Sequence, residues 1–380
     1  MMLYGTPGFR RQLSVDLDYQ EDVGKQWKAR YDANNEVVDY HENHSKWYSK
    51  YHPNETKYHV DVDTGEKFVV GINSTGFRGK EFSKEKREGV IRVVTLGASS
   101  TFGFYNRDHQ TYPYQLEQML NEKCDQHTYE VINLAIPHSK SDNIAAIFAL
   151  EALPLKPDIV TFYEGRNETI IDARSTHDIA MVRPWDGRLN ESVKTDQPSV
   201  TSQIGDYLMS VRFVLFLLEQ RAQDDDQYTI AEIDKISRAR SAHFLGNVRY
   251  IAEECHKRGI LFLPTTQQGT SMSWFGSTPE QRQRIKGVTL QDEVDGIRAR
   301  LEWGDAINYF EACLLVHQHM QRDLKTWVQA QEMPLIDGIS LLDNDRNYLV
   351  TWVHLHPKGN EILAGAMAET ILRHTCQETE

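Results

Sequence analysis

Cysteine is scarce in this 380-residue sequence, and its few positions suggest no covalent or metal framework. The four cysteines lie far apart and include no Cys-x-x-Cys pair. They therefore indicate neither a zinc knuckle nor a disulfide scaffold. Reduced thiols are typical of cytosolic proteins, so we expect all four cysteines to be reduced. Their positions are Cys124, Cys255, Cys313 and Cys376.

Long apolar runs and a positive charge balance are also missing. The longest apolar run, residues 208–218, is interrupted by Arg212 and is too short to cross a bilayer. The opening segment MMLYGTPGFRRQ has no apolar core like that of a signal peptide. The formal net charge of −13 argues against nucleic acid or an anionic membrane surface as a partner. We expect a cytoplasmic protein without a transmembrane segment.

Common cofactor and hydrolase motifs are absent as well. The sequence contains no GxGxxG, no GxxxxGKS or GxxxxGKT, no HExxH and no GxSxG. His41 and His44 have no third metal ligand nearby in the sequence, so we interpret them as surface or hydrogen-bonding residues. We therefore predict that the chain needs neither a metal nor an organic cofactor.

Segments with strand and helix patterns alternate along most of the chain. This alternation predicts a parallel sheet covered by helices on both faces. The predicted strands are residues 90–96, 129–134, 158–163, 260–264 and 335–342. The predicted helices are residues 112–123, 142–153, 241–258, 306–330 and 358–373.

The sequence predicts an N-terminal extension followed by one main domain. Residues 1–70 are polar and rich in Tyr, His and Asp, and we interpret them as an N-terminal extension packed on the core. Residues 71–380 form the main domain, with insertions at about 169–240 and 265–305. The first insertion contains a predicted amphipathic helix at residues 205–223. Because both insertions leave the carboxyl ends of strands, we expect them at the rim of the active site.

One stretch, residues 89–103 (GVIRVVTLGASSTFG), combines a strand with a tight Ser/Thr-rich turn. Gly97 ends the strand, and helical spacing follows from Tyr112. Open α/β sheets place their chemistry at the carboxyl ends of the strands. Ser99 lies in this turn and is a candidate nucleophile. The alternative is that Ser99 only caps the following helix.

Four segments resemble, in order, the conserved blocks of the SGNH (GDSL-like) hydrolases. GASSTFG at 97–103 is similar to the block with the nucleophilic serine, and VINLAIPH at 131–138 is similar to the second block. YEGRNE at 163–168 resembles the third, and VHLHPKGN at 353–360 resembles the block with the catalytic histidine. The resemblance implies a three-layer α/β/α sandwich, flavodoxin-like, with a central parallel sheet. It also implies hydrolysis of an O-acyl ester through an acyl-serine intermediate.

The resemblance implies roles for four residues. Ser99 would be the nucleophile and His354 the base, or His356 in a second register of the last block. The Asn167 side chain and the backbone N–H groups of Ser99 and His138 would form the oxyanion hole. His138 stands where the family has a glycine, and Asn167 could instead be only a turn residue.

The sequence departs from the family beside the histidine. The family usually has an aspartate three residues before it, and this chain has Thr351. A Ser–His dyad could act alone, Asp343 or Asp345 could replace the acid, or a backbone carbonyl could hold the imidazole. Loss of the carboxylate can lower the rate by orders of magnitude, so reduced or absent catalysis is one possible outcome.

These patterns favour a serine esterase that acts on a small-molecule acyl ester. One alternative is an acyltransferase that moves the acyl group to a sugar or natural-product alcohol. The other is a non-catalytic binding protein on the same fold, which Thr351 and His138 favour. Arg166 could meet an anionic group of a substrate, although a solvated or salt-bridged arginine is the commoner outcome.

Overall fold

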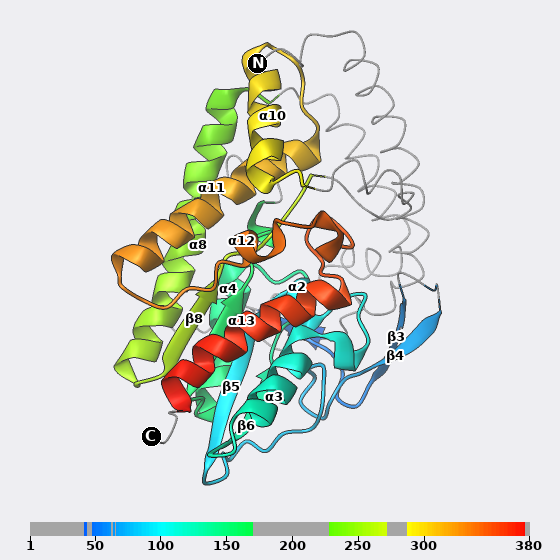
Figure 1. Ribbon diagram of the computed structural model, residues 1–380, viewed down its shortest axis with the longest axis vertical. Coiled ribbons are helices and arrows are strands. Elements are labelled where there is room, and N and C mark those ends of the chain that lie inside the picture. The colour runs from blue at the N-terminus through cyan, green and yellow to red at the C-terminus, as the bar shows by residue number, and fades with distance from the viewer. Residues whose placement is uncertain are drawn as a thin grey trace.

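A four-stranded parallel sheet in the order β6-β5-β7-β8 forms the centre of the molecule (Figure 1). The computed structural model describes residues 42–43, 48–61, 64, 66–169, 228–271 and 287–376. All four strands run in the same direction, so their carboxyl ends meet at one edge of the sheet. The strands are β5 (Val90–Gly97), β6 (Thr128–Asn133), β7 (Ile159–Tyr163) and β8 (Leu261–Thr265).

Helices cover both faces of this sheet. Figure 1 shows α3 (Tyr112–Lys123) and α13 (Pro357–Thr375) on the near face, and α4 (Ser141–Ile147) and α8 (Ile230–Lys257) on the far face. Helix α11 (Tyr309–Ala330) packs along α8. The other helical segments are α2 (Ser99–Phe102), α10 (Leu290–Glu302), α12 (Gly338–Leu342), η2 (Asp108–Gln110), η3 (Phe148–Ala152), η4 (Leu153–Leu155), η5 (Asn167–Thr169) and η6 (Arg346–Tyr348).

Neighbouring residues of each strand point to opposite faces, which gives the sheet two separate apolar cores. Val93 packs with residues of α3 and α13, whereas Val94 packs with residues of α4 and α8. Leu263 and Phe262 of β8 divide between the two cores in the same way. Burial on both faces explains why these strands are mostly apolar, and the charged Arg92 of β5 and Glu130 of β6 form an ion pair at 2.7 Å. The predicted three-layer α/β/α sandwich with a central parallel sheet is therefore confirmed.

The described part of the N-terminal region packs on the far-face core. It contains the short pair β1 (Glu42–Asn43) and β2 (Ser49–Lys50), and the antiparallel pair β3 (Thr56–Val60) and β4 (Lys67–Gly71). Phe68 and Val70 of β4 join the same apolar cluster as Phe102 of α2. The division of the chain at residue 70 into an extension and a main domain stays a prediction.

The predicted strand at residues 335–342 is wrong. Ile336 makes only a single parallel bridge to Thr265, and Gly338–Leu342 forms helix α12. The Asp337 side chain caps this helix by accepting a hydrogen bond from the backbone N–H of Ser340. A Cβ at Gly338 would lie 2.3 Å from the Thr266 carbonyl oxygen, so only glycine allows the close approach. The Asp-Gly pair thus turns an apolar run into a helix.

Helix α8 starts at Ile230 rather than at residue 241. A capping box forms there, because Thr229 accepts from the backbone N–H of Glu232 and the Glu232 side chain accepts from the backbone of Thr229. The last part of the predicted insertion at 169–240 therefore belongs to α8. The predicted amphipathic helix at 205–223 lies outside the described residues. In the described ranges, no helix has both the length and the apolar character needed to cross a bilayer.

The expectation of four reduced cysteines is also wrong. Cys124 and Cys376 form a disulfide with a Cα–Cα distance of 6.2 Å, while Cys255 and Cys313 are free and buried. Cys124 caps the C-terminus of α3 and Cys376 that of α13, so the bond joins the two helices of the near face. Disulfides persist mainly in oxidising compartments. The cysteines therefore no longer support the predicted cytoplasmic location.

We expect the double substitution of Cys124→Ala and Cys376→Ala to lower the free energy of unfolding by about 2–5 kcal/mol, because the bond restricts the unfolded chain. Urea unfolding followed by circular dichroism measures the change. A reductant should destabilise the wild-type protein and leave the double variant unchanged. Equal stability of the wild type with and without reductant would contradict the disulfide.

Candidate active site

Ser99 lies at the carboxyl end of β5, where it starts the short helix α2. Gly97 ends the strand in very close contact with its neighbours. A Cβ there would lie 2.6 Å from the Tyr163 carbonyl oxygen and 2.1 Å from Thr101 Oγ1. The buried Thr101 hydroxyl donates to the same Tyr163 carbonyl at 3.1 Å. The turn is thus fixed against β7, and the half-buried Ser99 side chain stands at the sheet edge.

The loop that carries His354 is held by hydrogen bonds to the segment that follows β5. The buried Ser100 hydroxyl donates to the Val353 carbonyl oxygen at 3.1 Å. The Asn106 amide nitrogen donates to the Leu355 carbonyl oxygen at 2.9 Å. The carbonyl groups on either side of His354 are therefore both anchored beside Ser99.

The His354 imidazole contacts two hydroxyl groups. Its Nε2 lies 2.8 Å from Ser99 Oγ, and its Nδ1 lies 2.6 Å from Thr351 Oγ1. The rings of Phe104 and Tyr105 pack beside the imidazole, with centroid distances of 5.5 and 5.2 Å. The site therefore contains a continuous contact chain from Ser99 through His354 to Thr351.

This imidazole is neutral over the physiological range of pH. Burial, together with charge repulsion from the nearby His138, lowers the pKa of His354 to about 3. The protonated ring would be a buried charge among aromatic side chains, which water cannot reach to stabilise.

His356 does not contact Ser99. It stands at the N-cap of α13, where its Nδ1 accepts from the backbone N–H of Lys358 at 3.3 Å. His354 is thus the histidine of this segment whose ring meets the Ser99 hydroxyl.

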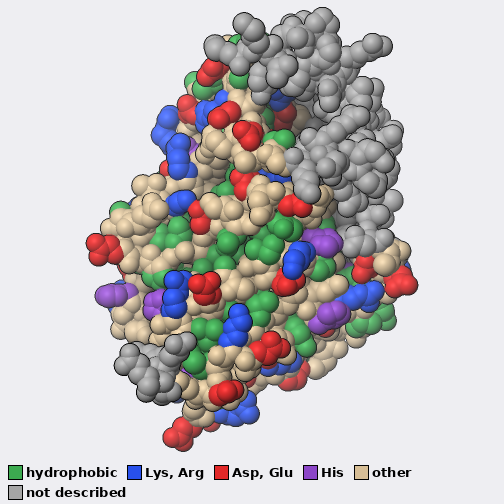
Figure 2. All heavy atoms as spheres, in the orientation of Figure 1, with side chains coloured by type: hydrophobic (Ala, Val, Ile, Leu, Met, Phe, Trp, Pro, Cys, Tyr) green, Lys and Arg blue, Asp and Glu red, His purple; other side chains and the backbone are tan. Residues whose placement is uncertain are grey.

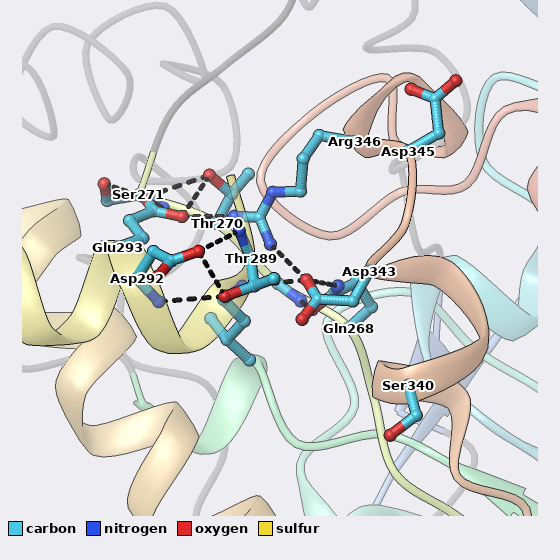
Figure 3. Close-up of polar contacts among 12 residues, drawn as sticks. Gln268, Thr270, Ser271, Thr289, Asp292, Glu293, Ser340, Asp343, Asp345 and Arg346 are labelled. Carbon is cyan, nitrogen blue, oxygen red and sulfur yellow. Dashed lines mark hydrogen bonds and ion pairs between the residues drawn. The ribbon is translucent and has the colours of Figure 1, made fainter. Parts of the chain in front are cut away.

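Neither candidate replacement for the missing acid faces His354. Asp343 Oδ1 accepts from the Gln268 amide at 2.8 Å and lies 3.3 Å from Arg346. Asp345 accepts from a backbone N–H in its own turn, and Figure 3 shows its carboxylate pointing away from the cluster around Arg346. Thr351 occupies the Nδ1 side of the ring instead.

Asn167 connects the loops that follow β6 and β7. Its side-chain nitrogen donates to the Ser139 carbonyl oxygen at 3.0 Å. Its backbone N–H donates to Glu164 Oε1 at 2.9 Å. Burial raises the pKa of Glu164 to about 7, although hydrogen bonds from the backbone N–H groups of Asn167 and Gly165 lower it.

His138 lies in an exposed turn beside these loops. Its φ of 62° is in the left-handed region that favours glycine. Ser139 N donates to the Ile136 carbonyl oxygen at 3.3 Å, and Pro137 precedes His138, which is the pattern of a type II turn. The backbone of His138 thus adopts a conformation for which glycine is the usual residue.

A buried polar layer, which was not predicted from the sequence, lies behind these loops. Gln267 is its centre: Oε1 accepts from the Arg166 backbone, and the Gln267 backbone N–H donates to Gln321 Oε1, both at 2.8 Å. His317 Nε2 lies 2.7 Å from the Gln267 carbonyl oxygen. A detectable signal was the uncharged polar run at 265–271, directly after an apolar strand, which is buried throughout.

Arg166 belongs to this layer and not to the surface. The side chain is buried, and Nη1 donates to Thr169 Oγ1 at 3.0 Å. The expectation that Arg166 is solvated or salt-bridged is therefore wrong, because the side chain is buried and forms no ion pair with another described residue. Glu168, two residues further, is also buried and accepts from the Ser141 hydroxyl.

A buried ion cluster ties the His354 loop to the second insertion (Figure 3). Arg346 precedes the loop and pairs with Glu293 of α10 and with Asp343. Glu293 also accepts from the Thr270 hydroxyl at 3.0 Å. The Thr270 backbone N–H in turn donates to the Trp352 carbonyl oxygen at 3.0 Å. The insertion thus supports the loop that carries His354.

We expect Arg346→Met to lower the free energy of unfolding by about 3–5 kcal/mol, because it leaves the buried Glu293 carboxylate and the partly buried Asp343 carboxylate without their partner. Lys358→Met is the matched control. It removes an exposed pair with Glu361 at 2.8 Å, for which we expect about 0–1 kcal/mol. Denaturant unfolding compares the two. Equal effects would show that Arg346 is not a structural anchor.

The described residues contain no group of three or more His, Cys, Asp or Glu side chains that could hold a metal ion. No family model matches the chain, and no curated protein matches it.

Several solved structures are similar in fold. A lipase/acylhydrolase from Enterococcus faecalis is 13% identical, with 75% of this chain and 96% of that chain covered and a TM-score of 0.41. A GDSL-like lipase from Bacteroides thetaiotaomicron is 12% identical, with 74% and 88% covered and a TM-score of 0.38. The acetyl xylan esterase AlAXEase is 16% identical, with 74% and 100% covered and a TM-score of 0.39.

Proposed function

We propose that the chain is a serine hydrolase of the SGNH type that cleaves a small O-acyl ester through an acyl-serine intermediate. The observation that supports this most is the 2.8 Å contact between Ser99 Oγ and His354 Nε2. The two residues come from distant segments and meet at the carboxyl edge of a parallel sheet, where such folds place their chemistry. A hydroxyl nucleophile with a base in hydrogen-bond reach is the minimal apparatus for acyl transfer.

In the proposed reaction, Ser99 Oγ attacks the ester carbonyl while His354 Nε2 accepts the hydroxyl proton. The imidazolium then donates this proton to the leaving alcohol. Water repeats the two proton transfers on the acyl-serine and releases the acid. All of these steps use protein side chains and water alone.

Three donors are proposed for the oxyanion: the backbone N–H groups of Ser99 and His138 and the Asn167 amide. The Ser99 N–H lies in the first turn of α2, where backbone N–H groups have no acceptor within the helix. A side-chain amide has two hydrogens, and Asn167 donates one to Ser139. The second is proposed to reach the oxyanion, where one donor typically contributes about 100- to 1000-fold in rate.

The charge distribution on the surface also agrees with a small-molecule substrate. Figure 2 shows basic and acidic side chains interspersed on the face that carries α3 and α13, without a large patch of one sign. Together with the net charge of −13, this favours a small substrate over a nucleic acid.

An acyltransferase is the second candidate, and the aromatic contacts of His354 favour it. Phe104 and Tyr105 pack directly against the imidazole and limit the approach of water. An alcohol acceptor that binds tightly would then compete with hydrolysis for the acyl-serine.

We expect Ser99→Ala and His354→Ala each to lower ester turnover by at least about 100-fold, since loss of a general base usually has that effect. His356→Ala is the matched control, because His356 does not contact Ser99, and it should keep most of the activity. A panel of acyl esters and labelling with a fluorophosphonate probe measure this. A wild-type protein that neither turns over esters nor reacts with the probe would favour the non-catalytic alternative.

We expect kcat/KM to show no inflection near pH 6.5. A general base must be neutral, and burial holds the pKa of His354 at about 3, so the working form persists as the pH falls from about 8 to about 5. The profile is measured by titrating the released acid at constant pH. A fall in kcat/KM around pH 6.5 in the wild-type protein would contradict the prediction that His354 is a desolvated base.

A further inference from the structure

The Thr351 hydroxyl has three hydrogen-bond partners and is fully buried. The backbone N–H groups of His354 and Val353 both donate to Thr351 Oγ1, at 3.1 and 3.3 Å. The third partner is His354 Nδ1, at 2.6 Å.

The direction of this third bond follows from the number of partners. A threonine hydroxyl has two lone pairs and one proton. Because two backbone N–H groups use the lone pairs, the proton of Thr351 is directed at His354 Nδ1.

We propose that Thr351 is a positioning residue that donates to His354 Nδ1 and so places the ring proton on Nε2. In this tautomer Nε2 donates to Ser99 Oγ across the 2.8 Å contact and offers it no lone pair. The imidazole must exchange its proton from Nε2 to Nδ1 before it can accept the Ser99 proton. The tautomer assignment does not depend on the function proposed above, but the effect of the tautomer on turnover rests on that proposed function.

The consequence for rate follows from the residue type at 351. A carboxylate only accepts hydrogen bonds, so it holds the proton on Nδ1 and leaves the Nε2 lone pair for the serine. In a serine protease, replacing that carboxylate by an amide leaves the geometry intact and lowers kcat by about 10⁴ through the wrong tautomer. The Thr351 hydroxyl imposes the same tautomer here.

The tautomer can be read directly in the full-length protein labelled with ¹⁵N-histidine. Ring nitrogens with and without a proton differ widely in ¹⁵N chemical shift, and His354→Gln identifies the signals of His354. We expect the wild type and Thr351→Ser to carry the proton on Nε2, because serine keeps the donor. Thr351→Asp should move it to Nδ1. A wild-type His354 with its proton on Nδ1 would overturn the proposal, even if no variant folded.

Turnover separates this proposal from the proposed function. If both hold, Thr351→Asp should raise kcat/KM for an aryl ester by at least about 100-fold, and Thr351→Ser should leave it near the wild-type value. If the tautomer changes as expected but Thr351→Asp gains no activity, the tautomer assignment stands and the esterase function fails. If Thr351→Asp gains activity with no change of tautomer, the positioning role of Thr351 is refuted.

Discussion

The parallel pairing of β5 between β6 and β7 decides where the candidate residues lie. Ser99, His138 and Asn167 each follow the end of one of these strands. Because parallel strands end at the same edge, three loops from separate parts of the sequence gather there. His354 does not follow a strand of this sheet. It reaches Ser99 because its loop is hydrogen-bonded to the segment after β5.

The sequence patterns predicted the part of the fold that depends on local chemistry. The four strands of the sheet are mostly apolar, and the loops after three of them carry the expected motifs. The prediction of a strand at 335–342 was wrong because Asp337 caps a helix and Gly338 fits against a carbonyl group. The Asp-Gly pair within this apolar run was the local signal of a turn. The prediction of four reduced cysteines was wrong because only the packing of α3 against α13 brings Cys124 and Cys376 together.

The sequence allowed the candidate residues to be proposed, but not their polar surroundings. A strand end is a local pattern, so Ser99 and Asn167 could be proposed from it, whereas His354 was proposed from the resemblance of residues 353–360 to a family block. The burial of Gln267 and Arg346 could not be predicted, because polar residues in loops are normally solvated. It depends on helices from other parts of the sequence, since Gln267 contacts Gln321 of α11 and Arg346 pairs with Glu293 of α10. Once buried, such groups need partners, and the structure supplies them as hydrogen bonds and ion pairs.

Burial also explains how a hydroxyl can stand beside the His354 imidazole. Charges inside the protein are stable only when paired, as Arg346 is with Glu293 and Asp343. A carboxylate at 351 would have to be desolvated against a ring held between Phe104 and Tyr105. Threonine avoids that cost, because every group in the chain from Ser99 to Thr351 stays neutral. The same neutrality removes the charge that would stabilise an imidazolium in the transition state. Stability and reactivity therefore make opposite demands on this one side chain.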